Sequence, residues 1–346
     1  MTLSRRLLQA GVPAGKMGAI ALFKCSWIRA IGALAVGVVV NQPFIAGAQP
    51  YPHKPVRVIV AFAAGGYADG VARQISQKLS ERIGQNFIVD NRGGAGGTIA
   101  AKIAADAAPD GYTLLVNTAA SAVNATLYKN PGFDILRDFA PVANTVSGAG
   151  LFVVLSSHPA NNLQDLIRLS RGKRLTYGTA GVGTSSHIAG DYLLRVLAKL
   201  DAVHVPFKGG GPALAAVLSG EVEVLSGTGT AAMPFIRQGR MKALGVSSLK
   251  RTEAFPNVPT VSEAGFPGFE ERSWVGFFAP AKTPAAIVER INREINAVLA
   301  LPDMVESFTS RGLDLHPGSP ADFARHLKVE VVMWAKIIKT TGVKAD

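Results

Sequence analysis

The chain has 346 residues, with 36 Lys and Arg, 24 Asp and Glu and a single cysteine, and its formal charge is +12 at pH 7. The basic residues are dispersed in single positions and short pairs, so the composition does not favour a nucleic-acid-binding protein. Because the cysteine is Cys25, close to the N-terminus, the rest of the chain can form no disulfide bond, zinc–thiolate site or cysteine nucleophile.

Residues 1–48 have the layout of an export signal, with five basic residues, no acidic residue and an apolar stretch at 31–40. A membrane-spanning helix needs about 20 apolar residues, roughly twice the length of this stretch. We therefore expect cleavage after Ala48, at the end of the small-residue sequence Ala46-Gly47-Ala48, and release into the periplasm. The pair Arg5-Arg6 is compatible with twin-arginine export, and the general secretory route stays open. The remaining 298 residues carry a formal charge of +7.

After this signal, strand-like runs rich in Val, Ile and Leu alternate with helical patterns. Val71, Ile75, Leu79 and Ile83 repeat every four residues, which predicts a helix that ends near Gly84. Similar stripes occur within 188–196, 287–295 and 323–334. The alternation predicts an α/β fold with parallel sheets. The strand-like runs are 56–62, 87–89, 113–116, 151–155, 175–177, 203–207, 222–225 and 242–246.

About 300 residues are more than one open α/β sheet usually needs and are typical of two domains. We expect domain 1 to comprise residues 49–150 and 273–346 and domain 2 to comprise 151–272, so the chain crosses twice between them. No linker rich in Ser, Gly or Pro divides the sequence, so both crossings are expected within structured strands. Two lobes joined at a hinge leave a cleft, which is a common binding place for a small ligand.

The first strand leads into a glycine-rich turn. The predicted strand ends at Phe62, Gly65 and Gly66 allow a close approach of the backbone, and the helix is predicted to begin near Asp69. Free N–H groups and the positive end of the helix dipole at such a turn suit a carboxylate or a phosphate. The alternative is purely structural, with Asp69 as a helix cap and the glycines as a chain reversal.

A second turn of the same kind follows the run 175–177. Thr179 and Gly181 lie in the turn, and Thr184, Ser185 and Ser186 add hydroxyl groups at the predicted start of a helix. Because the two turns fall in separate domains, they could hold one anion from both sides of the cleft. A simple N-cap role for Thr184 or Ser185 is the alternative.

Two further segments carry donors that could face the cleft. Asn117 and Thr118 follow the run 113–116, where strand ends are expected to meet the cleft. Lys208 and Gly209 belong to a third glycine-rich turn, in which Lys208 either contributes a positive donor or is solvated.

Motifs for catalysis and for cofactors are missing from the sequence. It contains no nucleotide-binding P-loop, no G-x-G-x-x-G, no G-x-S-x-G and no H-E-x-x-H. His187 is expected to pack or to cap a helix, and Glu221 and Glu223 are expected on a solvated strand face. We therefore expect no catalytic residue, no metal site and no cofactor.

From Tyr51 onward the sequence resembles the periplasmic solute receptors of tripartite tricarboxylate transporters, the Bug-type family. The resemblance covers nearly the whole of the processed chain, and its ordered set of motifs is specific. The matching stretches are 51–57, 62–73, 90–97, 109–115, 177–187, 204–209, 256–265 and 274–280.

The resemblance implies a two-lobed type II periplasmic binding fold, or Venus flytrap, in which each lobe is a mostly parallel sheet flanked by helices. It also implies a protein without catalytic activity that binds a small organic acid and delivers it to membrane transporter subunits. We expect it to act as a monomer. A periplasmic sensor subunit and a small-acid enzyme are the alternatives. By motif match, the ligand-binding residues are Phe62, Ala63, Gly65, Gly66, Asp69, Thr179, Gly181, Thr184, Ser185, Ser186, Lys208 and Gly209.

The sequence departs from the family pattern at Gly227, where many members carry an aspartate. An aspartate there could receive an amino group or another polar substituent. Its absence makes an amino-acid ligand less expected for this chain.

Overall fold

The structure is a computed structural model that describes residues 51–343, apart from the side chains of Thr340 and Thr341. The predicted export signal, its cleavage point at Ala48 and Cys25 lie outside the described residues. Within that range, no helix is long and apolar enough to cross a membrane.

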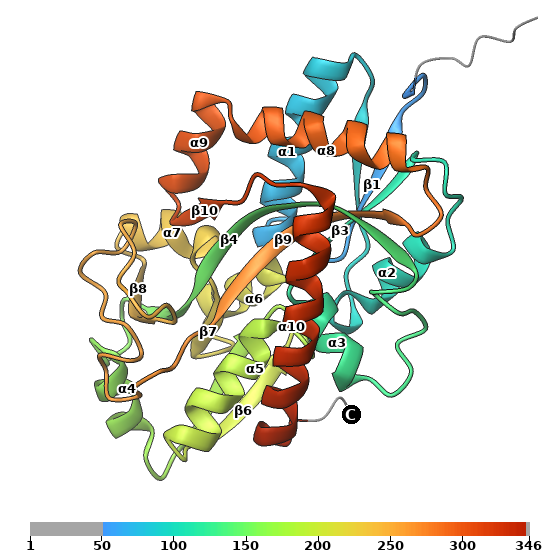
Figure 1. The fold of residues 1–346 in the computed structure, drawn as a ribbon. Helices are drawn as coiled ribbons and strands as arrows, with labels where there is room; N and C mark the ends of the chain where they lie inside the picture. Colours follow the sequence, from blue (N-terminus) through green and yellow to red (C-terminus); the bar gives the residue numbers. More distant parts are fainter. Residues whose placement is uncertain (1–50, 344–346) are drawn as a thin grey trace, which may run out of the picture. The chain divides into compact units, whose positions relative to one another are not determined.

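The sheet of the first lobe combines a parallel ladder with antiparallel neighbours (Figure 1). The strand β1 lies between β2 and β3 and pairs in parallel with both, whereas β9 pairs antiparallel with β3 and with the first part of β4. The short β10 pairs antiparallel with β4. These strands are β1 (Val56–Val60), β2 (Phe87–Asn91), β3 (Thr113–Thr118), β4 (Phe139–Leu155), β9 (Arg272–Pro280) and β10 (Leu313–Leu315).

The sheet of the second lobe repeats this plan. Its β5 pairs in parallel with β6 and β7, and the last part of β4 pairs antiparallel with β7 and β8. The long β4 therefore belongs to both sheets, through Ala149 in the first and from Gly150 in the second. The other strands of this lobe are β5 (Arg174–Thr179), β6 (Asp201–Pro206), β7 (Val224–Thr228) and β8 (Met241–Val246).

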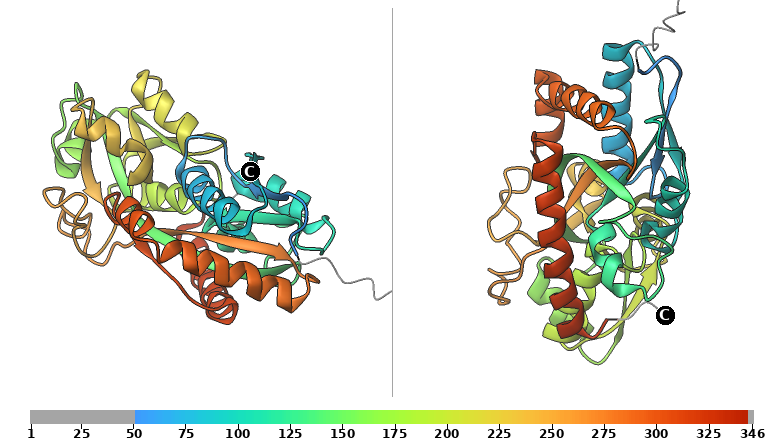
Figure 2. Two further views of the ribbon diagram at one scale, coloured as in Figure 1. Left: turned by 90° about the horizontal axis from the view of Figure 1, so that it is seen from above. Right: turned by 45° about the vertical axis from the view of Figure 1, so that its right-hand side comes forward.

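Helices flank both sheets, as the two further views in Figure 2 show. The first lobe has α1 (Tyr67–Ile83), η1 (Ala95–Gly97), α2 (Thr98–Ala105), α3 (Ala120–Leu127), α8 (Ala285–Leu299) and α9 (Pro302–Thr309). The second has α4 (Leu163–Ser170), α5 (Ser185–Asp191), α6 (Gly210–Leu218) and α7 (Gly229–Arg237), and α5 continues into the π-helix η2 (Tyr192–Leu197).

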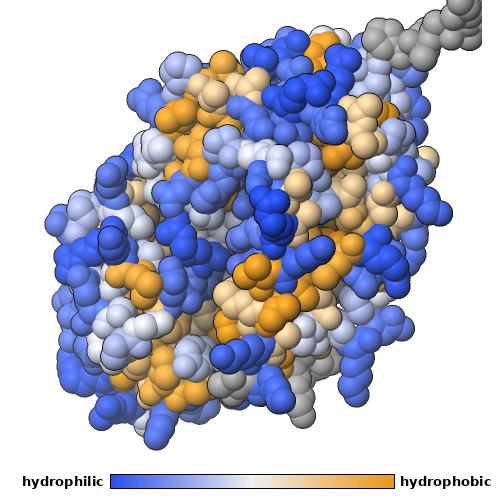
Figure 3. Space-filling view, viewed as in Figure 1, coloured by the Kyte–Doolittle hydropathy of each residue, from blue (hydrophilic) through white to orange (hydrophobic). Residues whose placement is uncertain are grey.

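The last helix, α10 (Pro320–Thr341), contacts β4 and α3 of the first lobe. It starts with a capping box between Ser319 and Asp322, and Pro320 occupies the first position, where a missing N–H costs nothing. Its C-terminal half also lines a surface hollow together with Ile188 and Tyr192 of the second lobe. Apolar side chains are exposed on its outer face, and Figure 3 shows apolar surface in this region.

Each lobe has its own apolar core. In the second lobe, Phe152 and Val154 pack on one face of the sheet with Leu193, whereas Leu151 and Val153 pack on the other face. This separation follows from the two-residue period of a strand, which points successive side chains to opposite faces. The buried core of the first lobe includes Ile59, Leu115, Phe277 and Phe278.

Each predicted strand-like run overlaps a strand, but β1 ends at Val60, before the predicted end at Phe62, and β7 begins at Val224, two residues after the predicted start of its run. The helix predicted to end near Gly84 ends there, with Gly84 left-handed at φ 75°. Sequence analysis did not foresee that β4 begins as early as Phe139, nor that β9 and β10 add antiparallel pairs. The domain boundaries at 150/151 and 272/273 stay a prediction.

Candidate functional site

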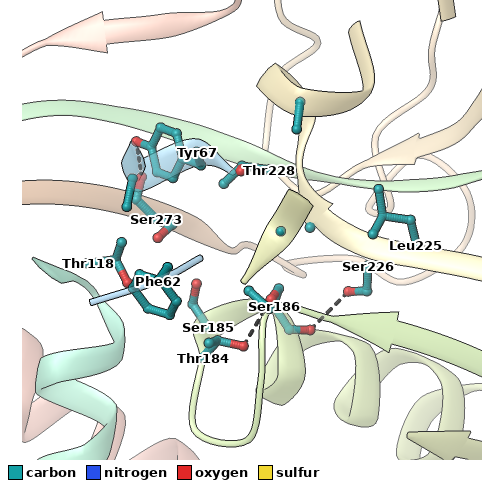
Figure 4. A pocket seen from close by; sticks show the side chains of 15 residues that line it. Phe62, Tyr67, Thr118, Thr184, Ser185, Ser186, Leu225, Ser226, Thr228 and Ser273 are labelled. Atoms are coloured by element: carbon teal, nitrogen blue, oxygen red, sulfur yellow. Dashed lines mark hydrogen bonds between the residues drawn. The ribbon is translucent and has the colours of Figure 1, made fainter. Parts of the chain in front are cut away.

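A cavity lies at the carboxyl ends of the parallel strands, between segments of the two lobes (Figure 4). Strand β3 ends at the cavity with Thr118 and β7 ends there with Thr228, and Phe62 follows β1 closely. In open α/β sheets ligands bind at this edge. The lining residues are Phe62, Tyr67, Ala68, Thr118, Ala180, Thr184, Ser185, Ser186, Gly210, Leu225, Ser226, Gly227, Thr228, Ala231 and Ser273.

Four helices begin at the wall of this cavity. The first residues of α1, α5 and α6 line it (Tyr67, Ser185 and Gly210), as do Thr228 and Ala231 at the start of α7. The first N–H groups of a helix have no partner within the helix and form its positive end. Among residues 51–343, no side chain caps α1, α6 or α7, and no backbone carbonyl accepts from their first N–H groups. Their N–H groups are therefore available to an anion in the cavity.

Three hydroxyl groups at the cavity retain a proton that they can donate to a solute. The Thr118 Oγ1 accepts a hydrogen bond from the Ala120 N–H at 3.2 Å and has its own proton left to donate. The hydroxyls of Thr228 and Ser273 make no hydrogen bond within the described part of the chain. Because Thr118 and Ser273 belong to the first sheet and Thr228 to the second, donors face the cavity from both lobes.

Other hydroxyl groups in the lining are used to hold the wall together, so they shape the cavity instead of offering a free donor. These hydrogen bonds run from the Tyr67 hydroxyl to the Ser273 carbonyl (3.1 Å), from the Thr184 hydroxyl to the Gly181 carbonyl (2.8 Å) and from the Ser226 hydroxyl to the Ser186 carbonyl (2.9 Å).

None of the described residues that line the cavity has a charged side chain. An anion held there would be stabilised by hydroxyl groups and by helix N-termini, both of which act more strongly once water is excluded. Across residues 51–343, no group of three or more His, Cys, Asp or Glu side chains is arranged to hold a metal ion.

In the first predicted turn, several backbone N–H groups have internal partners. The Ala63 N–H donates to the Lys208 carbonyl at 2.8 Å, and the Gly65 N–H donates to Asp69 Oδ2 at 2.9 Å. Asp69 is buried, which by itself would raise its pKa, but hydrogen bonds from Arg73, the Gly65 N–H and Asn91 outweigh burial and place this pKa below its ordinary value. Asp69 is thus an ionised group that fixes the turn from behind the cavity.

The second predicted turn is also supported from behind. The Gly181 N–H donates to Thr179 Oγ1 at 3.2 Å, and this oxygen lies 2.7 Å from Nε2 of His204. The His204 ring stacks on the His187 ring, with the ring centres 4.0 Å apart. Burial, and to a smaller extent the nearby His187 and Arg195, lower the pKa of His204 to about 3. A neutral imidazole therefore supports the turn.

The third glycine-rich turn brings the backbones of the two lobes into contact. A Cβ atom on Gly211 would lie 2.5 Å from the Ala64 carbonyl oxygen, and one on Gly66 would lie 3.1 Å from the Gly210 nitrogen. Glycine at these positions allows a main-chain contact between the lobes that any larger residue would push apart. The Lys208 side chain is exposed and does not line the cavity.

The structure places some of the predicted ligand-binding residues in the cavity wall and others behind it. Those in the wall are Phe62, Thr118, Thr184, Ser185 and Ser186. Those outside the wall are Ala63, Gly65, Gly66, Asp69, Asn117, Thr179, Gly181, Lys208 and Gly209. Asn117 is fully buried, and its Oδ1 accepts a hydrogen bond from the Thr118 N–H at 2.8 Å. The binding role of all these residues stays a prediction.

Sequence analysis missed part of the lining. Tyr67 and Ala68 were overlooked because α1 begins two residues before the predicted start at Asp69. Thr228 follows a predicted strand and precedes a helix, which is the same signal that identified the other turns. Ser273 lies on an antiparallel strand without a glycine turn, so no local pattern marks it. The other lining residues that were not predicted are Ala180, Gly210, Leu225, Ser226 and Ala231.

Residues 71–343 match the profile of the tripartite tricarboxylate transporter family receptor. A similar sequence is the UPF0065 protein from the tcbD-tcbE intergenic region of Pseudomonas sp. strain P51. It is 36% identical over 321 residues, which cover 92% of this chain and 95% of the relative.

Solved structures of periplasmic binding proteins share the fold. The periplasmic binding protein BugD has a TM-score of 0.83 and 33% identity, over 86% of this chain and 100% of that chain. The R. palustris protein Rpa4515, solved with adipate, has a TM-score of 0.81 and 33% identity, over 85% and 99% of the two chains. These likenesses confirm the two-lobed periplasmic-binding-protein fold.

Proposed function

Since the chain belongs to the tripartite tricarboxylate transporter receptor family, we propose that it is a periplasmic receptor that binds a small organic acid between its lobes and delivers it to a membrane transporter of that class. One observation supports this proposal above all others. Helix N-termini and free hydroxyl groups converge on a cavity whose lining has no charged side chain.

The chemistry of this cavity suits a carboxylate. A carboxylate oxygen accepts hydrogen bonds from N–H and O–H donors, and the start of a helix adds favourable partial charge. The N–H groups that begin α1 and α6 and the hydroxyls of Thr118, Thr228 and Ser273 form such a set. The adipate that accompanies the R. palustris relative is an acid of this class.

We also propose that the lobes comprise residues 49–150 with 273–346 and residues 151–272, and that they move about the two crossings. The pairing of β4 supports the first crossing, because β4 changes from one sheet to the other between Ala149 and Gly150. The second crossing falls where β9 begins at Arg272. Opening there would break the main-chain contact between the segments 62–66 and 207–211.

The receptor is proposed to act as a monomer after export and to leave its ligand chemically unchanged. The cavity lining supports the second point, because among the described lining residues it has no His, Asp, Glu, Lys or Cys, and burial raises the pKa of Tyr67, whose hydroxyl donates to the Ser273 carbonyl. Incubation of the receptor with a bound acid, followed by mass spectrometry, is expected to return that acid intact. Deletion of the gene is expected to abolish uptake of the same acid.

A thermal-shift screen of the exported, processed protein tests the proposed ligand class. The protein is unfolded and refolded first, to remove any ligand that co-purifies, and is then mixed with mono-, di- and tricarboxylates and with neutral sugars as controls. A ligand at 100 times its Kd adds about 2.7 kcal/mol to the free energy of unfolding. We expect at least one carboxylate to raise the Tm and the sugars to leave it unchanged. Stabilisation by a sugar alone would contradict the proposal.

A further inference from the structure

A buried carboxyl group lies directly behind the ligand cavity. Glu271 is 5% exposed and immediately precedes β9, next to the place where the chain crosses between the lobes. Its carboxyl interacts with the hydroxyls of Ser185 and Ser247 and with the backbone of Gly150. Because Ser185 also lines the cavity, it connects Glu271 to any ligand held there.

The hydrogen bonds around Ser247 indicate where the protons lie. Its Oγ accepts from the Gly150 N–H at 2.7 Å and is only 2.6 Å from the backbone carbonyl oxygen of Glu271. Such a short oxygen–oxygen distance requires the single hydroxyl proton to point at that carbonyl. The same Oγ is 3.1 Å from Glu271 Oε2. An ionised carboxylate would have to share the one Ser247 proton with the carbonyl, whereas a neutral carboxyl group of Glu271 can itself donate to Ser247 Oγ.

The other carboxyl oxygen supports this assignment. Oε1 of Glu271 is fully buried and has no hydrogen-bond partner among residues 51–343. A buried carboxylate oxygen without a donor is strongly disfavoured, whereas the carbonyl oxygen of a neutral carboxyl group is tolerated far better. Burial raises the pKa of Glu271, and it outweighs the opposing effects of the nearby Ser185 and Ser247 hydroxyls, the Gly150 backbone and the charge of Arg272.

No ion pair joins Glu271 to another residue within 51–343. Arg272 is adjacent in sequence, but its guanidinium is paired with Asp314 and also donates to Ser147 Oγ at 3.3 Å. On α10, Glu330 accepts hydrogen bonds from two tryptophan side chains. The remaining titratable groups that share a hollow or an interaction with Glu271 are Tyr67, Tyr192, Glu270, His316, His326 and Lys336.

We propose that Glu271 carries a proton in the ligand-free receptor and that its ionisation weakens the binding of an anion in the cavity. A negative charge at this position would repel the anion, and it would also draw the Ser185 hydroxyl away from the ligand. Glu271 is therefore a positioning residue that acts on the ligand through Ser185. Binding of the acid anion is favoured at lower pH and is accompanied by uptake of a proton where Glu271 titrates.

This inference rests on the proposed function, and calorimetric titration with adipate between about pH 5 and 9, above the ordinary Glu pKa, tests it. The Kd of the unmodified receptor is expected to rise with pH, by up to about ten-fold per pH unit where Glu271 ionises. Glu271→Gln keeps the shape of the neutral carboxyl group. This variant is expected to bind adipate with the low-pH affinity throughout. The Kd of the unmodified receptor divided by the Kd of the variant is therefore expected to rise with pH. The titration of adipate itself cancels in this ratio. Glu270→Gln changes an exposed neighbouring carboxylate and is expected to keep the unmodified profile.

A second measurement needs no variant. Titrations of the unmodified receptor in buffers with different ionisation enthalpies report the number of protons taken up on binding. Uptake that approaches one proton at some pH in the range supports the proposal, and zero uptake throughout overturns it. A Glu271→Gln protein that keeps the full pH dependence also overturns it. If no carboxylate binds at any pH, the proposed function itself fails, which is a different outcome.

Discussion

Thr118 and Ser273 offer hydroxyl protons to the cavity from neighbouring strands of the first lobe. Thr118→Val and Ser273→Ala remove these donors with little change in volume. Each is expected to weaken carboxylate binding by about 1.5–3 kcal/mol, the usual worth of a hydrogen bond to a charged group. Isothermal titration measures the effect, and Thr309→Val, on α9 outside the cavity, is the matched control. Unchanged affinity in both cavity variants would remove these hydroxyls from the site.

Gly227 lines the cavity and has room for a side chain. The nearest atoms to a Cβ there belong to Leu225, at 3.8 Å. Gly227→Asp would place a carboxylate beside the anionic ligand in a setting of low dielectric, so its affinity for carboxylates is expected to fall by at least about ten-fold. Gly227→Asn has nearly the same shape without the charge. Equal losses in both variants would show that the effect is steric and not electrostatic.

At the scale of elements, the contact between the start of α6 and the turn after β1 depends on the absence of a side chain at Gly211. Gly211→Ala would force a Cβ to within 2.5 Å of the Ala64 carbonyl, so the lobes must separate slightly there. Overpacking of this kind typically costs about 1–3 kcal/mol, and we expect a corresponding loss of ligand affinity. Gly70→Ala on α1 is the control, because a Cβ at Gly70 meets nothing within 4 Å. Equal affinities in the two variants would argue against a role for this contact in closure.

The stacked imidazoles behind the second turn predict an acid-sensitive element. The pKa of His204 is lowered from its ordinary 6.5 to about 3, chiefly by burial. Between these values the unfolded chain binds more protons than the folded one, so the free energy of unfolding falls as pH drops below about 6.5. Urea unfolding at several pH values should show this fall, with a smaller one in His204→Gln. His53→Gln, at an exposed histidine, should behave as the unmodified protein does. If the free energy of unfolding of His204→Gln falls equally with pH, other titratable groups cause the acid sensitivity.

The strands and glycine turns were predictable because each has a local cause. Runs of β-branched residues, helix stripes and turns such as Gly65-Gly66 are visible in the sequence and reappear in the structure. The antiparallel pairing of β9 with β3 and β4 depends on residues more than 120 positions apart. No local pattern encodes such a pairing, so Ser273 could not be placed in the cavity from sequence.

The sequence also does not reveal which backbone N–H groups already have a hydrogen-bond partner. The sequence indicated that the backbone at Ala63, Gly65 and Gly181 could face a ligand, but their N–H groups donate to the Lys208 carbonyl, Asp69 and Thr179. Only the fold shows which turns touch each other and so satisfy their own donors. The N–H groups that begin α1, just after Gly65, and α6, just after Gly209, have no such partner among residues 51–343.

At the scale of the whole receptor, the central claim is that an anion is held without any positively charged side chain in the cavity wall. A neutral analogue of the same shape would keep the apolar contacts but would lose the attraction to the helix N-termini and would place amide N–H groups against the site's own donors. The net basic charge of residues 49–346 favours the approach of anions but does not provide this discrimination.

Titration of the refolded, exported protein with adipate and with its diamide, at a pH where adipate is ionised, measures this discrimination directly. If adipate proves not to be the preferred acid, the acid with the largest thermal shift and its amide take its place. The account predicts that the acid binds at least about 100-fold more tightly, equivalent to roughly 2.7 kcal/mol. Equal or tighter binding of the amide would contradict it.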